Sequence, residues 1–167
     1  LKELASTGTD DPTQQKVAEL FATWMDVSTI ESRGLSPLQP DLERIAAAED
    51  FDDLMVLVGD INMASPIGFG IRPDPADTSR YIVFISQAGL GMGRDYYINE
   101  GPEYDNYRNA YLQYIATILS LLDNPEPAIN AEQVFALETA LAKQHWTPAQ
   151  RRNVQATYNP MDREDLK

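Results

Sequence analysis

The segment SQAGLGMGRDYY (86–97) has the composition of a ligand-binding loop, with glycines at positions 89, 91 and 93. Glycine-rich turns can cradle phosphate, but a dinucleotide site has the spacing G-x-G-x-x-G and a P-loop ends in Gly-Lys-Ser/Thr. Here the spacing is G-x-G-x-G, and Asp95 would place a carboxylate close to any bound phosphate. We therefore interpret the loop as a turn, in which glycine adopts backbone angles that other residues avoid and lets strand 80–86 reverse sharply.

Metal chemistry requires ligands that this chain has in short supply. A catalytic zinc site has three protein ligands, usually including histidine, and an open position for water. The chain contains no cysteine and a single histidine, His145, and it has no H-E-x-x-H motif. His145 precedes Trp146 at an expected helix end, where a capping or half-buried imidazole is the ordinary outcome. The sequence predicts no metal and no cofactor in this segment.

Two acidic groups could be considered as calcium ligands: Asp74 with Asp77, and the cluster at positions 50, 52 and 53. Neither has the spaced D-x-[DN]-x-[DN]-G pattern of a calcium loop. We assign the first group to a turn and the second to a helix start.

Other chemistries are equally weakly supported. The single histidine has no G-x-S-x-G partner for serine catalysis. A carboxylate pair for glycoside hydrolysis depends on the fold, so spacing leaves it open. Arg151 and Arg152, close to Trp146, could form an RNA-stacking patch, but we interpret them as partners of local carboxylates. We predict no catalytic, cofactor-binding or metal-binding residue in the chain.

Composition excludes several classes of protein. The formal net charge is −13, from 26 acidic and 13 basic residues. Such a negative surface disfavours nucleic acid and anionic membranes as partners. Hydrophobic residues make up 43% of the chain, as in globular proteins, and no apolar run approaches the 18 to 20 or so residues of a membrane helix. The absence of cysteine leaves the compartment open.

The elements that position these residues are mostly helical. Residues 1–10 are predicted to be a loose lead-in. Asp11-Pro12, with Gln14 three residues after the cap, predicts a helix start followed by an apolar stripe to Met25. Further helices are expected at 41–48 and after Asp50, the latter broken by Ser65-Pro66. IGFGI (67–71) and RYIVFIS (80–86) then predict a β-hairpin with a long turn-forming loop between its strands.

The helical pattern returns from Pro102. Eight apolar or aromatic residues share the predicted inner face of this helix: Tyr107, Ala110, Tyr111, Tyr114, Ile115, Ile118, Leu119 and Leu122. A linker at 123–127 precedes a last long helix, 131–145, with Asn130 as cap, Gln133 at its third position, and Val134, Leu137 and Leu141 inward. Thr147-Pro148 predicts one more helical turn, and residues 158–161 a loop. The predicted fold is mainly α with one small β-hairpin at about 66–87.

Three stretches in order resemble one family: QKVAELFATWMDVSTIESRGLSPL (15–38), SRYIVFISQAGLGMGRDYYI (79–98) and ALETALAKQHWTPAQRRNVQATYNPM (136–161). They are similar to the N-terminal half of the neprilysin-like (M13) zinc metallopeptidases, which also include endothelin-converting enzymes and bacterial oligopeptidases. The resemblance implies two mainly helical lobes around a large cavity. One lobe carries H-E-x-x-H and a later glutamate as zinc ligands, and the other is a lid that restricts access to peptides of limited size.

The resemblance places residues 11–167 in a partial helical lid domain, upstream of every zinc ligand. It implies that the parent protein is a zinc-dependent hydrolase of peptides. Zinc and the catalytic lobe would then lie in the same polypeptide but outside this segment, and this segment alone would be inactive. Arg94, Asp95, Tyr96 and Tyr97 would then be structural residues. The Leu90–Arg94 turn is shorter than in many family members, which implies a differently shaped turn. Vertebrate members have a cysteine in the first helix where this chain has Thr23 or Trp24, which suggests a bacterial relative, periplasmic or extracellular by resemblance.

The alternative to a lid fragment is a free-standing acidic helical module that binds a protein partner through an exposed apolar face. A nucleotide-binding enzyme ranks third. The expected tests are an open reading frame that continues into H-E-x-x-H for the first hypothesis, a natural stop just after Lys167 for the second, and stabilisation by NAD or ATP for the third.

Overall fold

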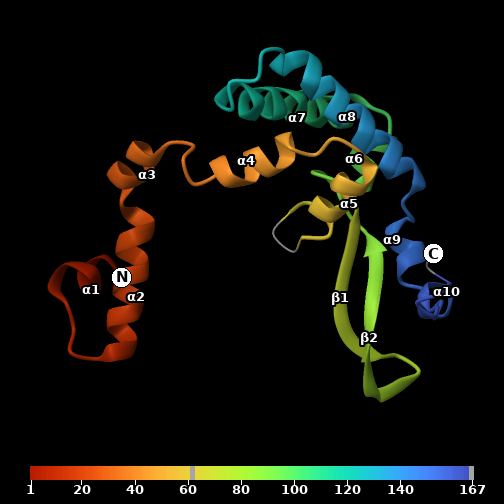
Figure 1. The fold of residues 1–167 in the computed structure, drawn as a ribbon, viewed down its shortest axis with the longest axis horizontal. Helices are drawn as coiled ribbons and strands as arrows, with labels where there is room; N and C mark the ends of the chain where they lie inside the picture. The colour runs from red at the N-terminus through yellow and green to blue at the C-terminus, as the bar shows by residue number, and fades with distance from the viewer. Residues whose placement is uncertain (61–62, 166–167) are drawn as a thin grey trace. The chain divides into compact units, whose positions relative to one another are not determined.

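The structure is a computed structural model that describes residues 1–60 and 63–165. It divides into two compact units, residues 1–49 and 50–167. Within the described ranges it is mainly helical and contains one two-stranded antiparallel hairpin, as predicted (Figure 1). No helix there is long and apolar enough to cross a membrane.

The first unit contains four helices: α1 (Lys2–Thr7), α2 (Pro12–Met25), α3 (Val27–Arg33) and α4 (Gln39–Ala46). The predicted start of α2 is confirmed, because the Asp11 carboxylate accepts from the backbone N–H groups of Thr13 and Gln14 and Pro12 occupies the first turn. Residues 1–10 were expected to be irregular, but α1 forms within them and contacts α2. Helix α4 begins two residues before the predicted start.

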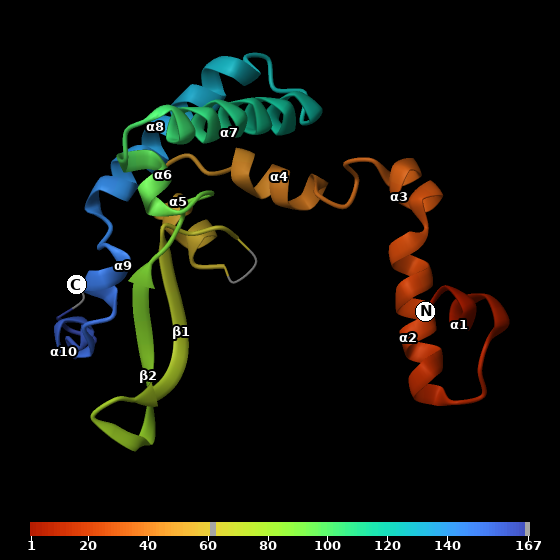
Figure 2. The same cartoon turned by 180° about the vertical axis from the view of Figure 1, so that it is seen from behind.

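The second unit begins with α5 (Phe51–Val58), capped by Asp50 as predicted. Helix α5 ends well before Ser65-Pro66, and residues 61–62 of the predicted continuation lie outside the described residues. After the hairpin come α6 (Arg94–Ile98), α7 (Pro102–Leu121), α8 (Pro127–Gln144), α9 (Pro148–Arg151) and α10 (Val154–Thr157). Helices α7 and α8 pack side by side with α6 against both, and the hairpin extends away from them (Figures 1 and 2).

The hairpin differs from the prediction at its tip. Strand β1 (Ile67–Asp74) and strand β2 (Asp77–Gln87) run through most of the segment expected to be a long loop, so that only residues 75 and 76 connect them. The Asp74 side chain is the reason: it is buried, accepts from the backbone N–H of Ala76, and binds the Arg80 Nε and Nη2 at 2.9 and 2.7 Å. The hydrogen bonds of Asp74 thus continue the strand pairing to the tip, where a long loop had been expected.

The inner faces of α7 and α8 also differ from the prediction. Ile115 is buried, but Tyr107, Tyr114 and Ile118 are exposed, because α6 and α8 cover a face that is rotated from the most apolar one. Helix α8 begins at Pro127, a residue suited to a first turn, rather than at 131. Its buried residues are Ala131 and Ala142, while Val134 and Leu137, both expected to face inward, are exposed.

Candidate functional site

The glycine loop lies where the hairpin meets helices α6, α7 and α8, and two of its glycines are required there. Gly89 has φ +79°, and a Cβ at this position would lie 2.6 Å from the Cα of Pro66. A Cβ on Gly91 would overlap the hydroxyl group of Tyr111. The third glycine, Gly93, has ordinary backbone angles and room for a side chain. The predicted use of backbone angles that other residues avoid is confirmed at Gly89, whereas Gly91 is required for lack of space.

A single carboxylate, that of Glu138 on α8, holds this loop against the helices. Its Oε1 accepts from the backbone N–H of Gly91 at 3.2 Å and from the Tyr111 hydroxyl at 3.1 Å. Its Oε2 accepts from the Tyr97 hydroxyl at 2.8 Å. The Tyr97 oxygen in turn accepts from the backbone N–H of Met92 at 3.0 Å. We call these residues, Gly91, Met92, Tyr97, Tyr111 and Glu138, the Glu138 network.

The electrostatics of this network favour structure over acid–base chemistry. Burial is the largest cause that raises the pKa of Tyr97 and of Tyr111, and the hydrogen bond from each phenol to Glu138 raises it further. Both phenols therefore stay protonated at neutral pH and act as donors to the carboxylate. Tyr97 is 6% exposed, and its ring stacks on Phe135 with centroids 5.5 Å apart. The hydrogen bonds that the Glu138 carboxylate accepts from the loop and from both phenols position the loop.

Arg94, Asp95, Tyr96 and Tyr97 have the structural roles that the resemblance implied. Arg94 donates from Nε to the backbone oxygen of His145 at 2.9 Å and pairs with Asp95 at 3.2 Å. The Tyr96 ring makes edge contacts with Tyr104 and Tyr107 of α7 at centroid distances of 5.9 and 4.9 Å. Together they join the glycine loop to the end of α8 and to α7.

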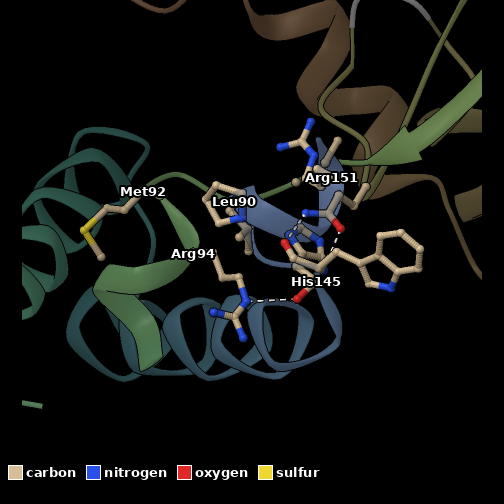
Figure 3. Close-up of a pocket in the computed structure, with 11 residues that line it drawn as sticks. Leu90, Met92, Arg94, His145 and Arg151 are labelled. Carbon is tan, nitrogen blue, oxygen red and sulfur yellow. Dashed lines mark hydrogen bonds between the residues drawn. The ribbon is translucent and has the colours of Figure 1, made fainter. Parts of the chain in front are cut away.

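A hollow of about 450 Å³ opens beside the glycine loop, between the end of β2 and the start of α9. Gln87 joins its two sides, because the Gln87 side chain accepts from the Trp146 N–H at 2.8 Å and donates to the Trp146 oxygen at 3.1 Å. In Figure 3, His145 lies between Arg94 and Arg151, and the Met92 side chain points away from the other labelled residues. Arg94 and Arg151 bring positive charge to this hollow.

His145 is the only histidine of the chain, and its surroundings do not fit a zinc ion. It follows the last residue of α8, as predicted, and its pKa is lowered by burial first and then by the positive charges of Arg151 and Arg94. Two guanidinium groups next to a lone imidazole would repel a dication, and zinc needs several converging ligands. Among the described residues no group of three or more His, Asp or Glu could hold a metal ion. We assign no zinc-dependent step to this chain.

The remaining residues that the sequence singled out lie apart from the hollow or have other partners. Asp74 and Asp77 cap the hairpin tip, and Asp50 caps α5, so their assignment to a turn and a helix start is confirmed. The assignment of Arg151 and Arg152 to local carboxylates is wrong: over residues 1–60 and 63–165 neither forms an ion pair. Arg151 is the last residue of α9 and Arg152 follows it, and the helix itself (PAQR) contains no acidic residue.

Sequence reasoning missed Glu138. It shares a face of α8 with Ala131, Phe135 and Ala142, at the spacing i, i+4, i+7 and i+11, so a helical wheel drawn from Pro127 would show an acidic residue within the inner face. The predicted inner face of this helix is centred on Val134 and Leu137 and therefore does not include Glu138.

Comparison with known proteins gives a consistent result. The profile of the N-terminal part of peptidase family M13 matches residues 1–167. Human "Membrane metallo-endopeptidase-like 1" is 31% identical over 96% of this chain and 24% of its own length, and guinea-pig (Cavia porcellus) "Endothelin-converting enzyme 1" is 27% identical over 96% and 23%.

Solved structures agree with the sequence relatives. The zinc metalloprotease Zmp1 of Mycobacterium tuberculosis in its open state superposes with a TM-score of 0.83 at 28% identity, over 98% of this chain and 26% of that one. The same protein in complex with an inhibitor gives a TM-score of 0.79 at 29% identity, over 95% and 25%. The chain therefore spans about a quarter of the length of its relatives. From the profile match and these superpositions, the chain belongs to peptidase family M13, of which it represents the N-terminal part.

Proposed function

We propose that this chain is part of a zinc-dependent metalloendopeptidase that hydrolyses peptides, and that it forms part of the lid and cavity wall. The observation that carries the proposal is the match of the whole chain to the N-terminal part of family M13, with a TM-score of 0.83 to about a quarter of a zinc metalloprotease. Zinc and the catalytic glutamate then belong to the remainder of that polypeptide. We also propose a bacterial parent located in the periplasm or outside the cell.

The exposed apolar surface of the second unit supports a wall that packs against further protein. One face of the hairpin carries the cross-strand pairs Phe69–Ile85 and Ile71–Val83, and each of these four side chains is at least half exposed. Contiguous apolar surface of this kind is typical of an interface. We propose that the catalytic lobe of the same polypeptide covers it.

The coding region beyond the codon for Lys167 provides the first test. An open frame that continues for several hundred codons into H-E-x-x-H and a later glutamate is the expected result. A stop codon directly after Lys167 would contradict the proposal and favour a free-standing interaction module, for which the same apolar hairpin face would be the binding surface.

The purified chain provides the second test. We expect no stoichiometric zinc by elemental analysis and no cleavage of a fluorogenic peptide, because the donor set around His145 does not fit the metal. Peptide hydrolysis by the pure chain that a chelator abolishes would show that the catalytic group lies within these residues, against the proposal.

A further inference from the structure

The hollow beside the glycine loop concentrates positive charge in a strongly acidic chain. It is lined by Arg94, His145 and Arg151, whereas the chain as a whole has a net charge of −13. Arg94 is paired with Asp95 at 3.2 Å. Arg151 has no carboxylate within 4.0 Å in the part of the chain that the structure describes. One guanidinium charge at the hollow is therefore not compensated by a local partner.

Arg151 is exposed to solvent, but it also takes part in forming the hollow. Arg151 belongs to the hollow's lining together with Arg94 and His145, and the three residues are labelled in Figure 3. The positive charge of Arg151 also lowers the pKa of His145, after burial and ahead of the charge of Arg94. The imidazole therefore stays neutral at pH 7 and adds hydrogen-bonding capacity without further charge.

The rest of the lining is suited to an organic group. Leu90, Trp146 and Pro148 provide apolar walls, and the backbone of Trp146 is fixed by two hydrogen bonds to the Gln87 side chain. The volume of about 450 Å³ lies within the range of about 300 to 1,000 Å³ that is typical of small-molecule pockets. It exceeds what a lone ion needs and leaves room for one or two amino-acid residues.

We propose that this hollow binds a carboxylate carried by a short peptide, with Arg151 as the ion-pair partner and Trp146 and Pro148 against the adjoining apolar side chain. Arg94 contributes charge, but its Nε is engaged by the His145 oxygen and its Nη1 by Asp95. Arginine suits the role because its planar fork can donate two parallel hydrogen bonds to a carboxylate. The proposal concerns the chain's own residues and does not depend on a zinc-dependent activity.

The single histidine makes the test direct. The imidazole signals of His145 are followed by NMR in a pH titration of the 167-residue chain, alone and with saturating N-acetyl-Ala-Leu. A bound carboxylate offsets the field of the two arginines, so we expect the pKa of His145 to rise by about half a pKa unit, the effect of one unit charge about 7 Å away in a largely aqueous site. The C-terminal amide of the same peptide should leave this pKa unchanged.

Variants assign the effect to the hollow. Arg151→Gln should weaken binding of the acid peptide about tenfold, as expected for loss of a charge-assisted hydrogen bond. Arg151→Lys, which keeps the charge but not the fork, should be intermediate. Arg152→Gln is the matched control, since the neighbouring residue carries the same charge outside the lining, and it should bind as the parent chain does. Dispersed amide spectra identify any variant that fails to fold.

Several outcomes would overturn the proposal. An unchanged His145 pKa with the acid peptide would show that no carboxylate enters the hollow. Equal effects of the acid and the amide would show apolar binding only, and an equal loss in Arg152→Gln would show diffuse charge attraction. Tighter binding of inorganic phosphate than of the peptide would identify a general oxyanion site instead of one for a peptide carboxylate.

Discussion

The Tyr97→Phe substitution tests the Glu138 network most sharply. It removes one hydroxyl group that serves both as donor to the Glu138 Oε2 at 2.8 Å and as acceptor from the Met92 N–H at 3.0 Å. The phenyl ring keeps its stack on Phe135, so the core volume hardly changes. The perturbation is therefore almost purely polar, and it leaves two groups without their partner.

The expected loss follows from these two groups. A hydrogen bond to a charged group contributes about 1.5 to 3 kcal/mol, and an orphaned backbone N–H adds about 1 kcal/mol where water cannot replace the partner. We therefore expect Tyr97→Phe to lower the free energy of unfolding by about 2 to 4 kcal/mol. Tyr111→Phe should cost less, about 1 to 2 kcal/mol, because the Glu138 Oε1 retains the N–H of Gly91.

Urea denaturation of the second unit measures both losses. The chain has two tryptophans, and Trp24 lies in the first unit, so a Trp24→Phe background leaves Trp146 fluorescence as the reporter. Trp146 is hydrogen-bonded to the end of β2 and so responds when the hairpin separates from α8. A Tyr97→Phe loss below about 0.5 kcal/mol, or one no larger than that of Tyr111→Phe, would refute the view that the carboxylate depends on this phenol.

Three further results are expected. Gly91→Ala should lower the unfolding free energy of the second unit by about 1 to 3 kcal/mol, because the added Cβ overlaps Tyr111. Gly70→Ala, at an open position, should change it by under about 1 kcal/mol, and equal effects of the two substitutions in urea denaturation would contradict the packing argument. The free energy of unfolding should fall as the pH rises above about 10, because the pKa of Tyr97 is raised in the folded chain and the phenol therefore loses its proton first in the unfolded chain. In melts recorded over a pH series, Tyr97→Phe should reduce this dependence of stability on pH. Asp74→Asn should lower the melting temperature at pH 7 more than at pH 2. Hydrogen bonds to the carboxylate lower the Asp74 pKa in the folded chain, and their contribution to stability disappears as the carboxylate is protonated. An equal drop in melting temperature at both pH values would contradict this role of the Asp74 carboxylate.

Features that depend on a few neighbouring residues could be predicted from the sequence. The starts of α2, α5 and α9 follow from a capping side chain, with proline next to it in two of them, and all three are confirmed. Cap geometry is local, so the signal does not need the rest of the fold. The hairpin was recognised for the same reason, because its β-branched and aromatic residues cluster in two short runs.

Features that depend on distant partners could not be predicted. Tyr114 and Leu137 are apolar but exposed, and which face of α7 or α8 is covered is decided by α6 and by the other helix. The hairpin tip depends on the ion pair of Asp74 with Arg80, six positions further along the chain. Periodicity reports that a helix has an apolar face, but it does not report which neighbour covers it.

The candidate site was the least predictable part. The glycine loop was correctly interpreted as architecture, but the residue that holds it, Glu138, lies 47 positions from Gly91. The hollow between His145 and Arg151 likewise forms only when the end of β2 meets the start of α9. The resemblance to family M13 was carried by ordered motifs and needed none of this geometry.

The long separations within the Glu138 network also have a consequence for how the chain folds. Glu138 bonds to residues 27, 41 and 47 positions away, and Gln87 bonds to Trp146 across 59 positions. The α7–α8 pair joins neighbours in sequence and closes only a short loop, whereas the network also requires α6 and the glycine loop to be placed against that pair. We therefore expect the glycine loop to become ordered late in folding, after the helix pair has formed.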